Sequence, residues 1–285
     1  MLKKNLPSIF EFGRVLKIKI MTKIGKKIIW VTGASSGIGE ALVYQLHQLG
    51  AKLILSARRA NELERVKNAC TQKSEVHLLT LDLSEAETLE EKCKHALTLM
   101  GPIDVIIHCG GISQRDKVMN TSLAVDRRIM EVNYFGTVAL SKFLLPSMVT
   151  RKQGHHVIIT SVTGIISTPL RSAYAGSKHA LHGFFDALRA EHEKDNIHVS
   201  LICPGYIKTK ISFNALMGDG SKHNTMDKAQ DNGMSPQRCA SKIIKAIEQN
   251  KNEVYIGGFK EVAGIYLKRF FPNLFAKVVI KMAVN

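Results

Sequence analysis

The stretch Ile28-Ile29-Trp30-Val31-Thr32-Gly33-Ala34-Ser35-Ser36-Gly37-Ile38-Gly39 decides the fold of this 285-residue chain. Its first four residues form a short apolar run that predicts a buried strand, and apolar residues at helical spacing follow over 37–49. Glycines between a strand and a helix let the backbone approach a pyrophosphate, while the helix N-terminus offers unpaired N–H groups and a partial positive charge. We therefore expect a dinucleotide to be bound by Gly33, Ser35, Ser36, Gly37, Ile38 and Gly39.

Strands and helices alternate along the rest of the chain. The apolar runs show no alternation, as expected for strands buried on both faces, and helices between them imply right-handed crossovers and a parallel sheet. The further strands are expected at 53–55, 76–81, 105–107, 157–159, 199–202 and 254–256, and the helices at 37–49, 60–69, 85–99, 123–148, 174–194 and 236–249. Residues 206–234 are rich in loop-forming types and predict a mobile loop. We interpret the fold as a single doubly wound (Rossmann) α/β domain with a parallel sheet of about seven strands and a C-terminal helical extension.

The two ends of the chain are more basic than its middle. The formal net charge is +16, from 40 basic and 24 acidic residues. Eight basic residues and one acid, Glu11, lie in 1–30, and five basic residues and one acid, Glu261, lie in 260–285. We expect a basic N-terminal extension (1–26), a dinucleotide-binding catalytic domain (27–258) and an apolar, basic helical tail (259–285). Met21 is expected to be an alternative translation start.

Several classes of function are disfavoured by composition. No recognisable nucleic-acid-binding module accompanies the basic charge, so no nucleic acid partner is expected. Five cysteines without a CxxC pair indicate reduced thiols and a cytoplasmic protein, and neither a signal peptide nor a metal-ligand cluster is expected. Basic residues among apolar ones in the tail favour peripheral contact with an anionic membrane surface. The alternative is that the tail covers a neighbouring subunit or the substrate cleft.

The end of the second expected strand indicates which cofactor is bound. Ser56-Ala57-Arg58-Arg59 follows it, where a site for NAD would place a carboxylate on the ribose 2′-hydroxyl. A guanidinium suits a 2′-phosphate instead, so Arg58 predicts NADP(H), with a weaker case for Arg59. Asp82, after the third strand, is placed to accept a hydrogen bond from the adenine amino group, or to cap the next helix.

A pair of side chains suited to proton transfer lies further along the chain. Tyr174 and Lys178 are four residues apart and therefore share one helix face. A nearby ammonium favours the phenolate and should lower the pKa of Tyr174 from its usual value of about 10, which would suit it to general acid–base catalysis. Ser161, at the end of the fifth strand, could hold a substrate carbonyl beside Tyr174.

Together these motifs resemble the short-chain dehydrogenase/reductase family, over roughly 27–256. The resemblance rests on 32–39, Asp82, Asn133 within Asn133-Tyr134-Phe135-Gly136, Ser161, Tyr174, Lys178, and Pro204-Gly205 with Thr209. It implies a catalytic tetrad of Asn133, Ser161, Tyr174 and Lys178, in which Tyr174 protonates the carbonyl oxygen, Ser161 polarises it, Lys178 holds the nicotinamide ribose and Asn133 keeps a proton-relay water in place. It also implies cofactor contacts at Leu83, Gly110, Tyr174, Lys178, Pro204, Gly205, Ile207 and Thr209, and a homo-oligomer.

More narrowly, 133–148, 171–191 and 204–220 resemble the member-seven, hydroxysteroid-dehydrogenase-like branch of the family. That resemblance implies a membrane-associated enzyme acting on hydrophobic carbonyls or alcohols such as lipids, steroids or retinoids. One departure is His108-Cys109-Gly110-Gly111, where the family usually has Asn-Asn-Ala-Gly; the lost amides put cofactor affinity in question. Two alternatives stay open: a 3-oxoacyl-carrier-protein-type reductase, and a non-catalytic NADPH-binding sensor or scaffold.

Overall fold

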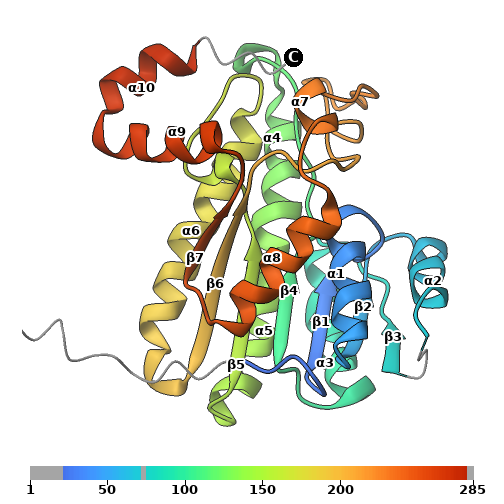
Figure 1. Cartoon of the computed structure of the whole chain (residues 1–285). Helices are drawn as coiled ribbons and strands as arrows, with labels where there is room; N and C mark the ends of the chain where they lie inside the picture. Colours follow the sequence, from blue (N-terminus) through green and yellow to red (C-terminus); the bar gives the residue numbers. More distant parts are fainter. Residues whose placement is uncertain (1–21, 72–74, 281–285) are drawn as a thin grey trace, which may run out of the picture.

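A parallel sheet forms the centre of the computed structural model, which describes residues 22–71 and 75–280 (Figure 1). Its seven strands follow the order β3-β2-β1-β4-β5-β6-β7. They are β1 (Ile28–Thr32), β2 (Lys52–Ser56), β3 (Val76–Leu78), β4 (Val105–His108), β5 (Gly154–Ile159), β6 (Ile197–Pro204) and β7 (Glu253–Ile256). Strand order reverses between β1 and β4, and in such sheets ligands bind in the crevice at that point. The predicted doubly wound fold is confirmed.

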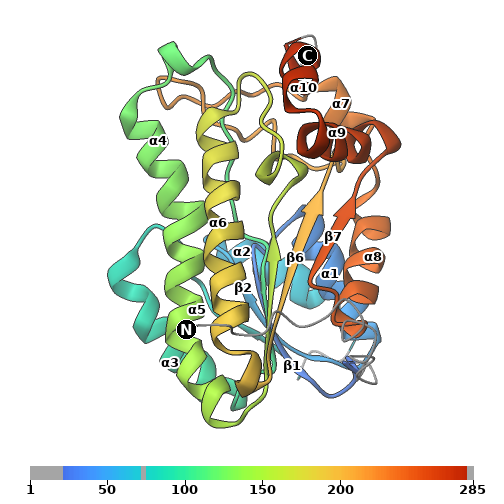
Figure 2. The ribbon, with the colours of Figure 1, turned by 90° about the vertical axis from the view of Figure 1, so that its left-hand side faces the viewer.

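Helices cover both faces of the sheet (Figure 2). One apolar core joins it to α1 (Gly37–Gln48), α2 (Ala60–Asn68) and α8 (Pro236–Glu248), and a second joins it to α3 (Ala86–Met100), α5 (Gly136–Thr150) and α6 (Ser172–Glu191). Leu42 and Ile243 belong to the first core, and Leu144 and Phe185 to the second. Because the strands lie between two apolar layers, they carry continuous apolar runs.

Several element boundaries differ from the sequence-based expectation, and three of these differences have a clear cause. β3 ends at Leu78 because it is an edge strand that pairs only with 53–55 of β2. β5 begins at Gly154, three residues early, because His155 and His156 are buried although their residue type is polar. The expected helix at 123–148 is α4 (Leu123–Met130) and α5, separated by a π-helical turn, η4 (Glu131–Phe135).

The C-terminal helices lie beyond the carboxyl ends of the strands (Figure 1). α9 (Phe259–Phe270) and α10 (Pro272–Val279) follow β7, and α7 (Lys228–Asp231) lies at the same end. The short turns are η3 (Val118–Asn120), η5 (Val162–Gly164) and η6 (Glu193–Asp195). No helix within the described part of the chain is long and apolar enough to cross a membrane. The expected start at Met21, most of the N-terminal extension and residues 281–285 of the tail lie outside the described residues.

Candidate active site

A cavity of about 810 Å³ lies at the carboxyl ends of the strands and runs from the glycine-rich turn to Tyr174. It is lined by every site residue expected from the sequence except two, Gly39 and Asn133. The structure therefore brings together, in one cavity, motifs that are more than 170 residues apart, as Gly33 and Thr209 are. Gly39 and Asn133 do not line the cavity themselves, but each contacts a residue that does, Gly33 and Ile112 respectively.

The glycine-rich turn leaves no room for side chains. Gly33 has φ +67°, and a Cβ there would lie 2.6 Å from the backbone nitrogen of Gly110. A Cβ on Gly39 would collide with the carbonyl of Gly33. α1 begins at Gly37, so its free N–H groups open into the cavity beside this bare backbone. Such a cradle fits the pyrophosphate of a dinucleotide.

Basic side chains surround Asp82 at the other end of the cradle. The nearest nitrogens of Arg58 and Arg128 lie 3.9 and 3.7 Å from Oδ2 of Asp82, and the backbone N–H and hydroxyl of Ser84 donate to its Oδ1. Burial raises the pKa of Asp82, but the Ser84 hydrogen bonds and the two guanidinium groups outweigh it and hold the pKa below its usual value. Asp82 therefore stays an acceptor, and the side chain of Arg58 is 59% exposed toward a ligand.

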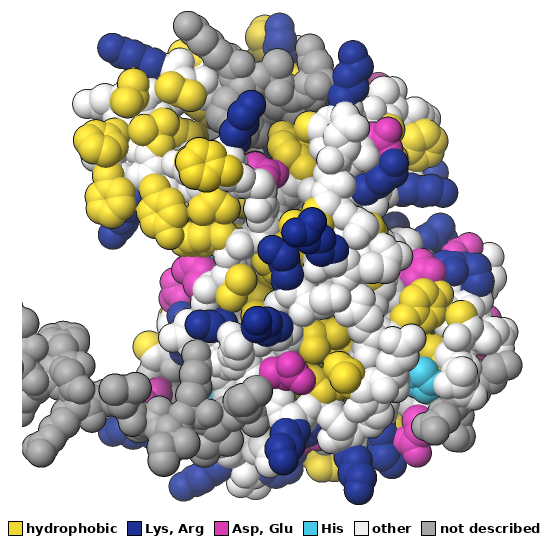
Figure 3. Space-filling view, in the orientation of Figure 1, with side chains coloured by type: hydrophobic (Ala, Val, Ile, Leu, Met, Phe, Trp, Pro, Cys, Tyr) yellow, Lys and Arg dark blue, Asp and Glu magenta, His cyan; other side chains and the backbone are white. Residues whose placement is uncertain are grey.

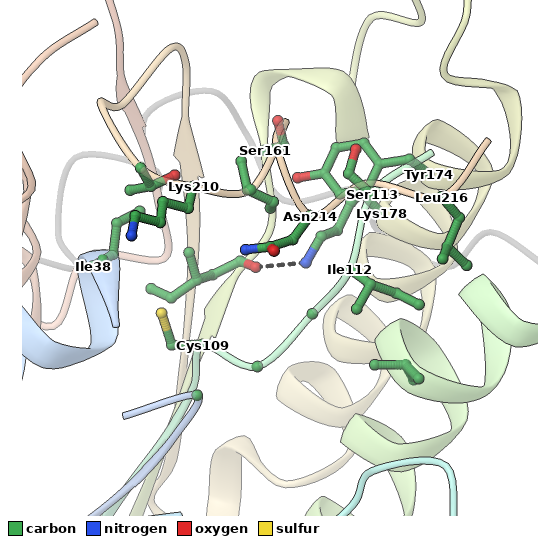
Figure 4. A pocket seen from close by; sticks show the side chains of 18 of the residues that line it. Ile38, Cys109, Ile112, Ser113, Ser161, Tyr174, Lys178, Lys210, Asn214 and Leu216 are labelled. Carbon is green, nitrogen blue, oxygen red and sulfur yellow. Dashed lines mark hydrogen bonds between the residues drawn. The ribbon is translucent and has the colours of Figure 1, made fainter. Parts of the chain in front are cut away.

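Tyr174 and Lys178 lie in the first turns of α6 and point into the cavity with Ser161 (Figure 4). Lys178 Nζ donates to the carbonyl oxygen of Ile159 at 2.9 Å and lies 5.8 Å from the centre of the Tyr174 ring. Burial lowers the pKa of Lys178 to about 8. The carbonyl at the end of β5 thus fixes the ammonium beneath the phenol.

The acidity of Tyr174 differs from the expectation based on Lys178. Burial raises the pKa of Tyr174 above its ordinary value, and the opposing influences are a hydrogen bond with Ser161 and the charges of Arg171 and Arg115. The prediction that the neighbouring lysine brings this pKa down is therefore wrong in this structure, because burial outweighs the nearby cations. A phenol that stays protonated at neutral pH is suited to donate a proton to a carbonyl oxygen.

Asn133 is fully buried in the π-helical turn η4. Its Nδ2 donates to the carbonyl of Ile112 at 2.9 Å and to Oγ of Ser177 at 3.0 Å, and its Oδ1 accepts from the N–H of Ile112 at 2.8 Å. The amide therefore joins the segment after β4 to α6. Both of its N–H donors are used, so only Oδ1 has capacity left for the water that the resemblance implied.

The departure at His108-Cys109 is accommodated by other contacts. The imidazole of His108 is buried, stacks on His156 at 6.3 Å between ring centres, and shares a 2.9 Å hydrogen bond with Ser141. The backbone N–H groups of Cys109 and Gly110 donate to Oγ1 of Thr32 at 3.2 and 3.3 Å. The turn is thus braced without the two asparagines, and the cavity keeps its bare glycine wall.

Comparison with known proteins identifies the family. The family model described as short chain dehydrogenase matches residues 27–217. The chain belongs to the short-chain dehydrogenase/reductase family. It is 43% identical to a Dehydrogenase/reductase SDR family protein 7-like of Anopheles gambiae (95% of this chain, 90% of that one) and 40% identical to a Dehydrogenase/reductase SDR family member 7B of Mus musculus (96% and 87%).

A solved structure supports the same fold. A short-chain dehydrogenase/reductase from Burkholderia phymatum in complex with NAD superposes with a TM-score of 0.80 at 21% identity, covering 89% of this chain and 96% of that one. This short-chain dehydrogenase/reductase is therefore an oxidoreductase of the class that acts on CH–OH groups. A nicotinamide dinucleotide is the cofactor typical of the family.

One cluster of buried charged side chains in this short-chain dehydrogenase/reductase was not predicted from the sequence. Arg115, Arg171 and Asp227 are each at least nine-tenths buried and form an ionic cluster at the catalytic end of the cavity. Asp227 Oδ2 accepts from Arg115 Nε and Nη2 at 2.9 and 2.7 Å and from Arg171 Nη2 at 3.0 Å. Asp227 lies 56 residues from Arg171 and 112 residues from Arg115, so the sequence carries no local signal of this cluster.

Proposed function

We propose that this protein is an NADP(H)-dependent oxidoreductase that interconverts a carbonyl and a secondary alcohol on a hydrophobic substrate. The observation that carries the proposal is the shared cavity, in which Ser161, Tyr174 and Lys178 face the space that leads to the glycine cradle. When bound, the nicotinamide supplies or accepts the hydride. A scaffold without catalytic activity has no need of a buried phenol and ammonium, each costly to desolvate.

The chain's own residues hold and protonate the substrate oxygen. The hydroxyl of Tyr174 donates its proton to the carbonyl oxygen, and the hydroxyl of Ser161 polarises the same oxygen. Lys178 is fixed by the carbonyl of Ile159 and presents its ammonium below Tyr174, where a ribose hydroxyl would lie. Apolar side chains on the catalytic side of the cavity exclude water from a hydrophobic substrate, namely those of Ile112, Val162, Ile166 and Leu216.

The preference for NADP(H) is supported by the charge at the adenosine end. Three arginines, Arg58, Arg59 and Arg128, line this part of the cavity with Asp82. A guanidinium binds a 2′-phosphate through charge-assisted hydrogen bonds and gains little from a hydroxyl.

Fluorescence titration with NADPH and NADH tests this preference. We expect NADPH to bind at least about tenfold more tightly, and Arg58→Gln to remove most of that difference by loss of a charge-assisted contact. Arg127→Gln removes an exposed cation outside the cavity and should change neither affinity. Tighter binding of NADH would overturn the choice of cofactor, and binding of neither would overturn the proposed function.

The surface of the C-terminal tail supports peripheral membrane binding, which would place the active site close to a hydrophobic substrate. Figure 3 shows apolar side chains gathered over α9 and α10, with basic side chains nearby. The exposed apolar residues are Phe259, Tyr266, Phe270, Phe271, Leu274, Val278 and Ile280. Lys260, Arg269 and Lys277 are exposed on the same two helices. An amphipathic, basic surface of this kind suits peripheral binding to anionic lipid.

Co-sedimentation with vesicles containing anionic phospholipid tests the membrane contact. The double variant Phe270→Glu with Phe271→Glu should lose most of its binding. Leu49→Glu, which changes an exposed apolar residue at the C-terminal cap of α1, should bind as the native chain does. Equal sedimentation of all three proteins would refute the contact. The contact would also be refuted if the native chain formed a dimer and the double variant did not, because the surface would then be a subunit interface.

A further inference from the structure

Two buried guanidinium groups share one carboxylate at the catalytic end of the cavity. Arg115 and Arg171 are 6% and 7% exposed, and both pair with Asp227, which is 7% exposed. The other acids that line the cavity, Asp82, Asp219 and Glu261, form no ion pair with either guanidinium among the described residues. Two positive charges therefore share one negative charge, and a buried charge is costly unless it is balanced.

The unsatisfied donors belong to Arg171 rather than to Arg115. Nη1 of Arg115 donates to Oγ of Ser113 and to the carbonyl of Gln114, each at 2.7 Å. In contrast, Nε of Arg171 is buried and has no hydrogen-bond partner, and the same holds for the hydroxyl of Thr168. Both residues line the cavity. Unpaired buried donors are rare enough to indicate a group that is yet to be bound.

The segment that carries these donors is held in an unusual conformation. Leu170, between Thr168 and Arg171, has φ +65°, a left-handed backbone that residues with a Cβ rarely adopt. Its carbonyl accepts from the N–H of Asp116 at 3.2 Å, which ties the segment to the loop carrying Arg115. Arg171 is also packed over the ring of Tyr206, 5.5 Å from the ring centre. The guanidinium is thus fixed before any ligand arrives, which reduces the entropy lost on binding.

The unsatisfied guanidinium acts at the same end of the cavity as the reacting group. The charges of Arg171 and Arg115 both reach the hydroxyl of Tyr174. Ile166 and Leu216 line this end as well, so a ligand that reaches Arg171 also meets apolar walls.

We propose that Arg171, with Arg115 and Thr168, forms an anion subsite that takes a carboxylate or phosphate group of the substrate. The substrate is then amphiphilic: an apolar body carries the carbonyl to Tyr174, and an oxyanion supplies the second negative charge that Arg115 and Arg171 lack. This inference rests on the proposed function, because it names the class of substrate for the same cavity. Asp227 keeps the two guanidinium groups together and neutralises only one of them.

Calorimetric titration of the intact protein, saturated with NADP⁺ so that the cofactor's own phosphate sites are filled, tests the subsite without requiring turnover. The probes are octanoate, octyl phosphate and 1-octanol, which share one chain and differ in the head group. We expect at least one anion to bind roughly ten- to a hundredfold more tightly than the alcohol. Whichever anion binds better identifies the head group as carboxylate or phosphate.

Variants assign that preference to Arg171. Arg171→Gln should lose most of the preference for the anion without changing the affinity for 1-octanol. Arg171→Lys keeps the charge, is the variant more apt to fold, and should retain only part of the preference, because an ammonium cannot reproduce the fixed guanidinium geometry. Arg127→Gln, which removes an exposed charge, should behave as the native chain does.

Two results would overturn the subsite. One is equal affinity of the native protein for the alcohol and both anions. The other is an anion preference that survives in both Arg171 variants. Failure of the proposed function looks different: no affinity for NADP⁺ or NAD⁺, and no turnover of any octanone with either reduced cofactor.

Discussion

The two ends of the cavity are built by different means. The cofactor cradle, residues 28–39 with 105–111, is shaped by backbone: Gly33 and Gly39 leave no space for a Cβ, and the strands around them are buried. The substrate wall, made of 113–118, 161–171, Tyr206, 211–234 and 258–280, is held by side chains, through the Arg115–Asp227–Arg171 cluster and a small apolar cluster containing Ile166 and Phe275. Recognition of the dinucleotide therefore depends on local geometry, whereas recognition of the substrate depends on long-range contacts.

The largest expected effect is a loss of stability at low pH. It affects both ends of the cavity at once, because the buried histidines responsible lie in the central strands beneath them. Burial lowers the pKa of His155 to about 3 and that of His156 to about 4, and holds the pKa of His108 well below its usual value. Below about pH 6.5 the unfolded chain takes up protons that the folded protein cannot, so stability is complete above pH 7 and falls as the pH drops toward 4. At pH 5, His155 and His156 should each cost about 2 kcal/mol of unfolding free energy.

Urea unfolding at pH 7 and pH 5 measures this loss. His156→Leu removes an imidazole with two unpartnered nitrogens. Its unfolding free energy should therefore fall by about 2 kcal/mol less than that of the native chain between pH 7 and pH 5. His95→Gln, on the exposed face of α3, serves as the control and should lose as much as the native chain. A native protein equally stable at both pH values would contradict the prediction.

Tyr174→Phe should separate the two ends of the cavity more sharply than any other single change. In the proposed reaction the hydroxyl is the proton donor, so turnover should fall by about a hundredfold or more, as for loss of a general acid. NADPH affinity should stay within about twofold, because the ring still fills the wall. Single-turnover kinetics and cofactor titration measure the two effects. Tyr44→Phe, whose hydroxyl bonds to Glu40 on the outside of α1, should change neither. Unchanged turnover in Tyr174→Phe would show that another group donates the proton, and a native chain without turnover would favour a scaffold.

Gly39→Ala should damage the cradle and spare the substrate wall. Its Cβ would collide with the carbonyl of Gly33, so we expect a loss of about 1–3 kcal/mol in unfolding free energy and much weaker cofactor binding. Gly183→Ala is the matched control, because a Cβ on this α6 glycine would have nothing within 4 Å. Its higher helix propensity should stabilise the protein by up to about 1 kcal/mol. Equal stability of the two variants would show that the cradle relaxes more than the backbone contacts suggest.

Phe275→Ala should have the smallest effect, confined to the substrate wall. Phe275 is buried in α10 against the apolar cluster that contains Ile166. Its truncation should raise KM for apolar carbonyls by about three- to tenfold, or about 1 kcal/mol, with unchanged NADPH affinity. Phe270→Ala, 68% exposed on α9, should leave both constants as they are. A matching change in cofactor affinity would mean that the two ends are not independent.

The sequence predicted most of the fold because each part of it has a local cause. The apolar runs, the glycines at 33–39 and the helical spacing after them are all read within a dozen residues. The errors came from tertiary context: the histidines at 155 and 156 are polar types that the sheet buries, and η4 interrupts what the pattern presents as one helix.

The candidate site divides in the same way. The glycine turn and the Tyr174–Lys178 pair follow from spacing, and the structure brings them into one cavity. The acidity of Tyr174 could not be predicted, because it depends on burial and on Arg171 and Arg115, which fold in from other segments. No spacing rule connects Arg115 with Asp227, so the ionic cluster emerges only from the folded chain.

Glu261 connects the tail to the cavity wall. Its carboxylate accepts from the N–H of Gly258, where α9 begins, and from the N–H of Tyr206 at 2.7 Å, on the loop that supports Arg171. A partner that displaces α9 must break this second bond, and the cavity changes with it. Such coupling is reciprocal. If the partner changes the affinity of the cavity for its ligand by some factor, the ligand changes the affinity of the tail for the partner by the same factor. If that partner is the proposed membrane surface, occupancy of the active site is coupled to membrane binding.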